Sequence, residues 1–136
     1  MEQVKSRSIE ETQAFGEKLA QILPKPSIVA FFGDLGAGKT TLIKSYVSFR
    51  TALKSDEISS PTFQILHIYN DLYHFDLWRV SNADEFLALG FDEYLDGKHD
   101  VCIEWSERIE PILPHNTCRV HIQALSENER QITYGF

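Results

Sequence analysis

The chain has 136 residues, 43% hydrophobic and 24% charged, which is typical of a globular protein and suits one domain over residues 1–136. Its formal net charge of −7 argues against direct binding of nucleic acid, which usually needs a basic surface. No apolar run reaches the roughly 20 residues of a membrane span and the first residues lack a secretory signal, so we expect a cytoplasmic protein that binds no membrane.

The first third of the chain predicts a helix, a buried strand and a second helix. Ser8 and Glu11 have the spacing of a capping box, and apolar residues recur at helical spacing over residues 9–22. Residues 27–32 are apolar at nearly every position, which is typical of a central strand with helices on both faces. Residues 42–53 carry the apolar spacing of another helix.

From residue 58 onward the pattern favours strands. Residues 62–69 and 72–76 flank Asn70-Asp71, a pair that suits a tight hairpin turn. Ser81 can then cap a short helix, and Gly90 would end it. These features predict a hairpin followed by a helical connection.

The last third of the chain predicts three more strands. Residues 100–104 form a short apolar run, and residues 118–124 and 132–136 alternate apolar and polar positions. Cys102 and Cys118 fall in these strands, and a reducing cytosol favours two buried thiols over a disulfide. The elements together predict a three-layer α/β domain with a mixed parallel and antiparallel sheet.

A phosphate-binding pattern lies between the first strand and the second helix. Gly33, Gly38, Lys39 and Thr40 satisfy G-x-x-x-x-G-K-[ST]. Glycines let successive backbone N–H groups converge on phosphate oxygens, and the following helix adds its positive dipole end. Lys39 can reach the outer phosphates, and the Thr40 hydroxyl can ligate Mg²⁺. The strand before the pattern and the helix after it are the context that a phosphate loop for ATP or GTP requires.

A second set of acidic side chains is needed beside such a loop. Asp76 and Glu104 each end a predicted strand. Either carboxylate can hold Mg²⁺ directly or through water, or orient the attacking water, and the sequence does not say which one ligates the cation. Either can instead be structural, paired with a neighbour such as Arg79. Lys39, Asp76 and Glu104 are therefore the predicted catalytic residues.

Other polar and aromatic residues carry weaker signals. Residues 59–62 contain small hydroxyls before a strand, and spacing alone favours a strand-entry turn over a switch that senses the γ-phosphate. Trp105 is predicted to lie in the core. The five histidines form no metal-binding pattern, and the sequence assigns them no role.

Four segments in this order and at these separations resemble the bacterial TsaE family of small P-loop ATPases. The segments are residues 33–41, residues 60–63, residues 74–79 and residues 104–105. The resemblance covers about residues 8–130. Trp78 stands where the family commonly has tyrosine, and Ser106 where proline is frequent.

The resemblance implies a role in making threonylcarbamoyladenosine in tRNA. Such a protein binds ATP or ADP with Mg²⁺ and acts with TsaB-like and TsaD-like partners, of which the TsaD-like protein performs the transfer. It contacts tRNA only indirectly. The resemblance implies that hydrolysis of ATP resets the complex, and we expect it to be weak for the isolated chain and stimulated by the partners.

The resemblance also implies roles for individual residues. Ile9 and Thr12 would line the adenine pocket, Ser60 and Thr62 would belong to a switch segment, and Arg130 would lie near the nucleotide. Thr40, Glu104 and Asp76 would serve the metal. The full set of expected nucleotide-binding residues is Ile9, Thr12, Gly33, Leu35, Gly36, Ala37, Gly38, Lys39, Thr40, Thr41, Ser60, Thr62 and Arg130.

Two other functions are compatible with a phosphate loop. One is a small kinase that passes the γ-phosphate to a metabolite, although the acidic stretch of residues 83–97 is a poor acceptor pocket. The other is an interaction module that binds nucleotide without hydrolysing it. Substitution of Asp76 or Glu104 discriminates the module from an ATPase, because only an ATPase depends on these carboxylates.

Overall fold

The computed structural model describes residues 1–34, 36–58 and 64–136. Its strands are β1 (Glu2–Ser6), β2 (Ile28–Phe32), β3 (Leu66–Tyr69), β4 (Leu72–Asp76), β5 (Asp100–Glu104), β6 (Cys118–Ala124) and β7 (Arg130–Gly135). Its α-helices are α1 (Ile9–Ile22), α2 (Lys39–Thr51) and α3 (Ala83–Ala88). Short 3₁₀ helices are η1 (Ser55–Glu57), η2 (Leu77–Arg79), η3 (Phe91–Tyr94), η4 (Ser106–Arg108) and η5 (Glu110–Ile112). No helix in these described ranges combines the length and apolarity that crossing a bilayer requires.

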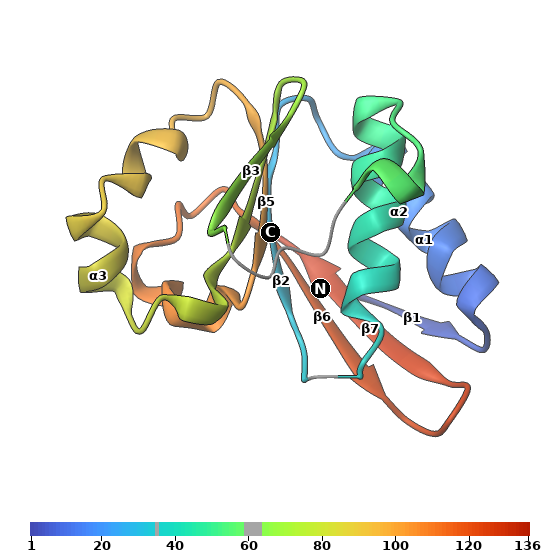
Figure 1. Ribbon diagram of the computed structural model, residues 1–136. Coiled ribbons are helices and arrows are strands. Elements are labelled where there is room, and N and C mark those ends of the chain that lie inside the picture. Colours follow the sequence, from blue (N-terminus) through green and yellow to red (C-terminus); the bar gives the residue numbers. More distant parts are fainter. Residues whose placement is uncertain (35, 59–63) are drawn as a thin grey trace.

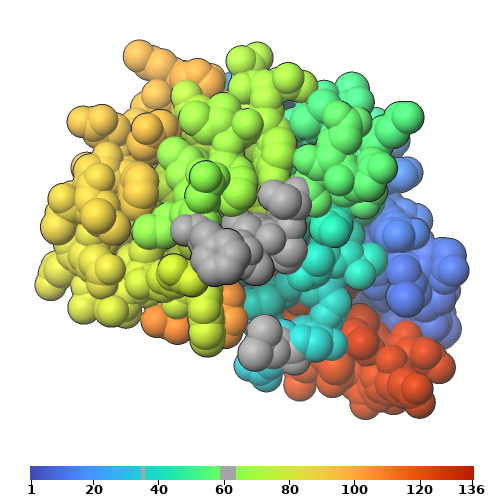
Figure 2. Space-filling model, viewed as in Figure 1, coloured from blue at the N-terminus to red at the C-terminus, as the bar shows by residue number. Residues whose placement is uncertain are grey.

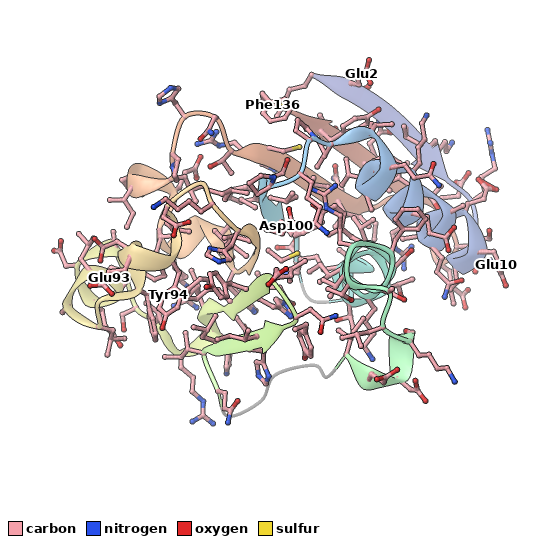
Figure 3. All side chains as sticks on the ribbon, turned by 90° about the horizontal axis from the view of Figure 1, so that it is seen from above. Glu2, Glu10, Glu93, Tyr94, Asp100 and Phe136 are labelled. Atoms are coloured by element: carbon pink, nitrogen blue, oxygen red, sulfur yellow. The ribbon has the colours of Figure 1, made fainter. Side chains whose placement is uncertain are left out.

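One mixed sheet forms the middle layer, in the order β1-β7-β6-β2-β5-β4-β3. The inner strands β6, β2, β5 and β4 run parallel, whereas β1, β7 and β3 pair antiparallel at the two edges. Helices α1 and α2 cover one face and α3 covers the other (Figure 1). Seen from above, Asp100 lies between Glu10 on the α1 side and Glu93 and Tyr94 on the α3 side (Figure 3). The predicted three-layer α/β fold with a mixed sheet is confirmed.

Strand β2 lies at the centre of both hydrophobic cores. All five of its residues are buried. Val29 and Phe31 pack in the cluster under α1 and α2, while Ile28 and Ala30 pack in the cluster under α3. A strand that is apolar on both faces is stable only between two layers of helix, which is why residues 27–32 predicted this position correctly. Its carboxyl end leads directly into the phosphate loop.

Most predicted boundaries agree with the structure, with differences at the caps. Ser8 caps α1, because its hydroxyl accepts a hydrogen bond from the Glu11 N–H at 3.0 Å. The predicted Ser81 cap of α3 is wrong, because the Asn82 side chain accepts from the Glu85 N–H at 2.9 Å instead. The predicted strand over residues 62–69 is seen as β3 from Leu66, and residues 59–63 lie outside the described part.

Strand β1 was not predicted. Its sequence is mostly polar and exposed, so it has no apolar alternation, and it is recognised only by its antiparallel pairing with β7. The prediction for the cysteines is confirmed, because Cys102 and Cys118 are both free and buried. Both pair with Val29, one from each side of β2. Two strand spacings of about 4.8 Å each therefore separate them, beyond the reach of a disulfide.

Candidate nucleotide-binding site

The phosphate loop connects β2 to α2 through backbone conformations that favour glycine. Gly33 has φ of 157°, and a side-chain carbon there would lie 2.6 Å from the Ile122 carbonyl oxygen of β6. Gly38 has φ of 97° and caps α2 in the left-handed conformation. The Leu42 N–H donates to the Gly38 carbonyl at 3.1 Å and closes the first helical turn. The N–H groups at the start of this helix lack helical partners and are available to an anion.

Lys39 is the first residue of α2, and its side chain is buried. The Nζ atom has no hydrogen-bond partner among the described residues, and it lies 4.5 Å from the ring centroid of Trp105. The ring offers a weak electrostatic partner, which does not replace the hydrogen bonds that an ammonium makes in water. A buried, incompletely satisfied cation at the end of a glycine-rich loop fits a phosphate group.

Trp105 holds this position through an unusual backbone conformation. It follows Glu104 with φ of 58°, a left-handed geometry that costs a non-glycine residue about 1 kcal/mol or more. One side of the indole packs on the cluster under α3, and Trp78 lies 5.0 Å away between ring centroids. The prediction that Trp105 lies in the core is therefore only partly correct, because its ring also faces the Lys39 ammonium.

The two predicted carboxylates lie side by side at the carboxyl ends of β4 and β5. Asp76 is directly opposite Glu104 in the parallel ladder. Asp76 Oδ1 accepts a hydrogen bond from the Trp78 N–H at 3.0 Å. Burial, assisted by the Glu104 charge, raises the pKa of Asp76 above its usual value, whereas the Trp78 N–H, His74 and Lys39 oppose the shift. Asp76 therefore interacts electrostatically with both Glu104 and Lys39.

A histidine that the sequence left without a role contacts one of these carboxylates. His74 Nε2 lies 2.6 Å from Glu104 Oε2, and both residues are buried. His74 is two residues before Asp76, so strand alternation places its side chain on the same face of β4. That alternation was the available signal, but recognising the partner required the register between β4 and β5.

A hollow of about 210 Å³ lies between α1, the start of α2 and the β6–β7 hairpin. It is lined by Ser8, Ile9, Thr12, Gly38, Thr41, Glu127, Asn128 and Arg130. Ile9 and Thr12 thus lie close to Arg130, which is far from them in the sequence, beside the phosphate loop. The sequence did not single out Glu127 and Asn128, because nothing in it places the hairpin tip here.

Arg130 connects the hairpin to the phosphate loop. Its guanidinium donates to the carbonyls of Ser126, Glu127 and Glu129 at 2.8, 3.2 and 3.0 Å, which fixes the turn. A second nitrogen lies 3.5 Å from the Gly36 carbonyl oxygen. The loop and the hairpin adjoin on the surface, in cyan and red respectively (Figure 2).

The remaining predicted residues are distributed around this loop. Thr40 is exposed at the start of α2, and Thr41 is half-buried behind it. Arg79 lies in η2, one turn beyond Asp76. Leu35, Ser60 and Thr62 lie outside the described residues, so their predicted contacts stay predictions.

The donor set fits a magnesium nucleotide. Magnesium in proteins is usually held by one or two carboxylates, a hydroxyl and phosphate oxygens, and Thr40, Asp76 and Glu104 are of these types. The part of the chain that the structure describes contains no group of three or more His, Cys, Asp or Glu side chains placed to hold a metal ion.

The fold and the loop together define a P-loop NTPase-type protein. Its structure is similar to the crystal structure of Bacillus subtilis YdiB, with a TM-score of 0.73 and 32% identity over 98% of this chain and 84% of that one. The chain is 36% identical to the tRNA threonylcarbamoyladenosine biosynthesis protein TsaE of Bacillus subtilis, over 98% of this chain and 86% of the relative. It is 34% identical to the Treponema pallidum protein of the same name, over 94% of this chain and 96% of the relative.

The family model described as threonylcarbamoyl adenosine biosynthesis protein TsaE matches residues 6–132. The chain belongs to the TsaE family. The resemblance inferred from four short segments is thereby confirmed.

Proposed function

We propose that this chain is the ATP-binding, Mg²⁺-dependent ATPase subunit required for threonylcarbamoyladenosine modification of tRNA. The observation that carries the proposal is the buried Lys39 ammonium, which has no hydrogen-bond partner among the described residues. Burying a cation costs free energy unless an anion compensates it. The outer phosphates of ATP are the anion that a lysine in this sequence pattern binds.

The nucleotide would lie across the phosphate loop with its base toward α1. Backbone N–H groups of residues 36–41 bind the phosphates at the start of α2. Adenine occupies the hollow lined by Ile9, Thr12 and Arg130. Arg130 keeps the hairpin side of this hollow in place, because it binds both the hairpin carbonyls and the Gly36 carbonyl.

The chemistry would be in-line attack of water on the γ-phosphorus, which breaks its bond to the bridging oxygen and releases phosphate and ADP. The Thr40 hydroxyl and one of the two carboxylates, Asp76 or Glu104, would hold Mg²⁺, which neutralises charge on the phosphate oxygens. The other carboxylate orients the water, and Lys39 neutralises charge that develops on the transferred group. The geometry supports these roles, because Asp76 and Glu104 lie directly opposite each other at the ends of β4 and β5.

The partners would be TsaB-like and TsaD-like proteins in the cytoplasm, with tRNA contacted only through them. A net charge of −7 supports an indirect role toward RNA. We expect slow hydrolysis by residues 1–136 alone, acting as one domain. Groups that partners supply to nucleotide switches accelerate hydrolysis by roughly a thousandfold or more.

The test is the threonylcarbamoyladenosine content of tRNA in cells that have lost the chain, measured by mass spectrometry of nucleosides. The wild-type chain should restore the modification, and Lys39→Ala should not. Lys44→Ala is the matched control, a lysine on the same helix that lines a different hollow. Restoration by Lys39→Ala would contradict the proposal, and restoration by Glu104→Gln would favour a module that binds nucleotide without hydrolysis.

A further inference from the structure

A buried side-chain contact between β4 and β5 joins a histidine to a predicted catalytic carboxylate. His74 Nε2 and Glu104 Oε2 are 2.6 Å apart, and the two side chains are 2% and 11% exposed. An ionised carboxylate only accepts hydrogen bonds, so the imidazole N–H is the donor. Short contacts of this type to a charged acceptor are among the stronger hydrogen bonds in proteins.

The sheet register determines this contact. His74 lies opposite Cys102 and Asp76 lies opposite Glu104 in the parallel ladder. The side chains of His74, Asp76 and Glu104 therefore share the face of the sheet that α2 covers, so the imidazole approaches the carboxylate from the amino-terminal side of the site. It engages Oε2 of Glu104.

We propose that His74 is a positioning residue for Glu104, an inference that rests on the proposed ATPase function. The imidazole donates to Oε2 and thereby holds the Glu104 side chain in one rotamer, with Oε1 directed to the magnesium nucleotide. A glutamate has three rotatable side-chain bonds, and ordering them before the nucleotide arrives removes that entropic cost from binding. In this role His74 does not itself touch the nucleotide or the attacking water, and it acts only through Glu104.

A neighbouring histidine provides a matched control. His67 on β3 is directly opposite His74 in the antiparallel ladder, with ring centroids 6.5 Å apart. Its Nε2 atom has no hydrogen-bond partner among the described residues. Substituting His67 thus perturbs the same hairpin and the same aromatic contacts but removes no hydrogen bond to Glu104.

The experiment compares His74→Leu, His74→Gln and His67→Leu with the wild-type chain. Affinity for ATP is measured by calorimetry in EDTA and in Mg²⁺, and kcat and KM are measured in the presence of the partner proteins. His74→Leu should leave the affinity in EDTA unchanged. Its Mg²⁺-dependent gain in affinity and its kcat should each fall roughly 10- to 100-fold, the usual effect of losing a residue that orients a metal ligand.

The conservative variant distinguishes positioning from folding. The glutamine amide nitrogen extends about as far from the backbone as histidine Nε2 and can donate to the same oxygen, so His74→Gln should recover most of the loss. His67→Leu should behave as the wild type. In a Glu104→Gln background, His74→Leu should add little, because a residue that acts only through Glu104 has nothing left to position.

Provided that the wild-type chain binds and hydrolyses Mg-ATP, any one of three results would overturn the inference. The first is that His74→Leu and His67→Leu lower the Mg²⁺-dependent affinity and kcat equally, and the second is that His74→Leu lowers the affinity for ATP equally with and without Mg²⁺. The third is that the effects of His74→Leu and Glu104→Gln add in full in the double variant. If His74→Leu does not fold, His74→Gln must retain the Mg²⁺-dependent affinity, and its failure to do so overturns the inference. A wild-type chain that neither binds nor hydrolyses Mg-ATP contradicts the proposed function itself.

Discussion

Two glycines of the phosphate loop differ in what surrounds them. At Gly33, with φ of 157°, a side-chain carbon would lie 2.6 Å from a backbone oxygen of β6. At Gly36, with φ of 79°, no atom of the described residues beyond its chain neighbours lies within 4 Å of such a carbon. Both positions disfavour other residues by conformation, but only Gly33 is also limited by packing.

Alanine substitutions at Gly33 and Gly36 should therefore lower the free energy of unfolding by different amounts. We expect Gly36→Ala to lower the free energy of unfolding by about 1 kcal/mol, from backbone strain alone. Gly33→Ala should lower it by about 3 kcal/mol, because the loop or β6 must also move. Urea unfolding of the nucleotide-free protein measures both. Equal losses would mean that the close approach to Ile122 has no energetic consequence.

The site residues that could be predicted from sequence were those whose chemistry is local. The phosphate loop lies within eight consecutive residues after an apolar strand, and each residue type there has its own reason. His74 and Trp105 could not be predicted in the same way. The role of His74 depends on the register between two strands, and that of Trp105 on a positive φ that its sequence does not signal.

At the scale of elements, α1 and α2 pack closely at Gly16. A side-chain carbon at Gly16 would lie 2.8 Å from Ser45 Cβ and 2.9 Å from the Leu42 carbonyl oxygen. Helices that approach this closely need a residue without a side chain at the crossing. The contact also sets where Ile9 and Thr12, on the same helix, lie relative to the phosphate loop.

Gly16→Ala should destabilise the protein although alanine is the better helix former. We expect a net loss of about 2 kcal/mol in the free energy of unfolding, because overpacking outweighs the gain of about 1 kcal/mol in propensity. Ala14→Gly, at an exposed position of the same helix, measures the propensity term by itself and should cost about 1 kcal/mol. If Gly16→Ala instead raised the free energy of unfolding, α1 and α2 would be able to move apart and accommodate the methyl group without cost.

The edge strand β1 is attached to β7 partly by a side-chain bond. The Tyr134 hydroxyl donates to the Glu2 carboxylate at 2.6 Å. This hydrogen bond raises the pKa of Tyr134 above its usual value near 10, and burial adds to the shift. The folded protein therefore keeps this proton at a pH where the unfolded chain has lost it.

Stability should consequently fall at alkaline pH through this group. Its contribution is fully present below about pH 10 and is lost as the pH rises through the folded-state pKa. Tyr134→Phe should cost about 1 kcal/mol at neutral pH and should lose stability less steeply above pH 10 than the wild type. Chemical unfolding across pH 7–11 tests this, and parallel curves for the two proteins would contradict it.

At the scale of the whole molecule, Arg50 joins four elements at the end opposite the phosphate loop. It donates to the Ala20 and Leu23 carbonyls at the end of α1, at 2.8 and 3.0 Å. It also pairs with buried Asp100 of β5 at 2.9 Å. Asp100 in turn accepts from the Ser27 N–H, next to β2, at 2.9 Å. This network fixes both helices of one layer to the centre of the sheet.

Removing the negative charge of this network should strongly destabilise the fold. Asp100→Asn leaves the Arg50 charge buried without its counter-ion, and we expect a loss of about 3 kcal/mol in the free energy of unfolding. Asp71→Asn, at an exposed position beside the same network, should change it by less than about 0.5 kcal/mol. Thermal and urea unfolding compare the two, and similar small effects would mean that the ion pair is dispensable.

The layer arrangement could be predicted because it follows from hydrophobic patterns, whereas this network could not. A strand apolar on both faces requires helices on both sides, so residues 27–32 alone indicated three layers. Arg50 and Asp100 are 50 residues apart. Nothing local in either segment pairs them, and only the folded chain brings them together.

In the proposed function, the phosphate loop serves a partner-stimulated ATPase. The most direct test is phosphate release from Mg-ATP by the purified chain, alone and with the TsaB-like and TsaD-like proteins of the same organism. We predict slow release alone, strong stimulation by the partners, and loss of that stimulation in Lys39→Ala. Rapid release by the chain alone, or equal release by the wild type and Lys39→Ala with the partners present, would contradict it.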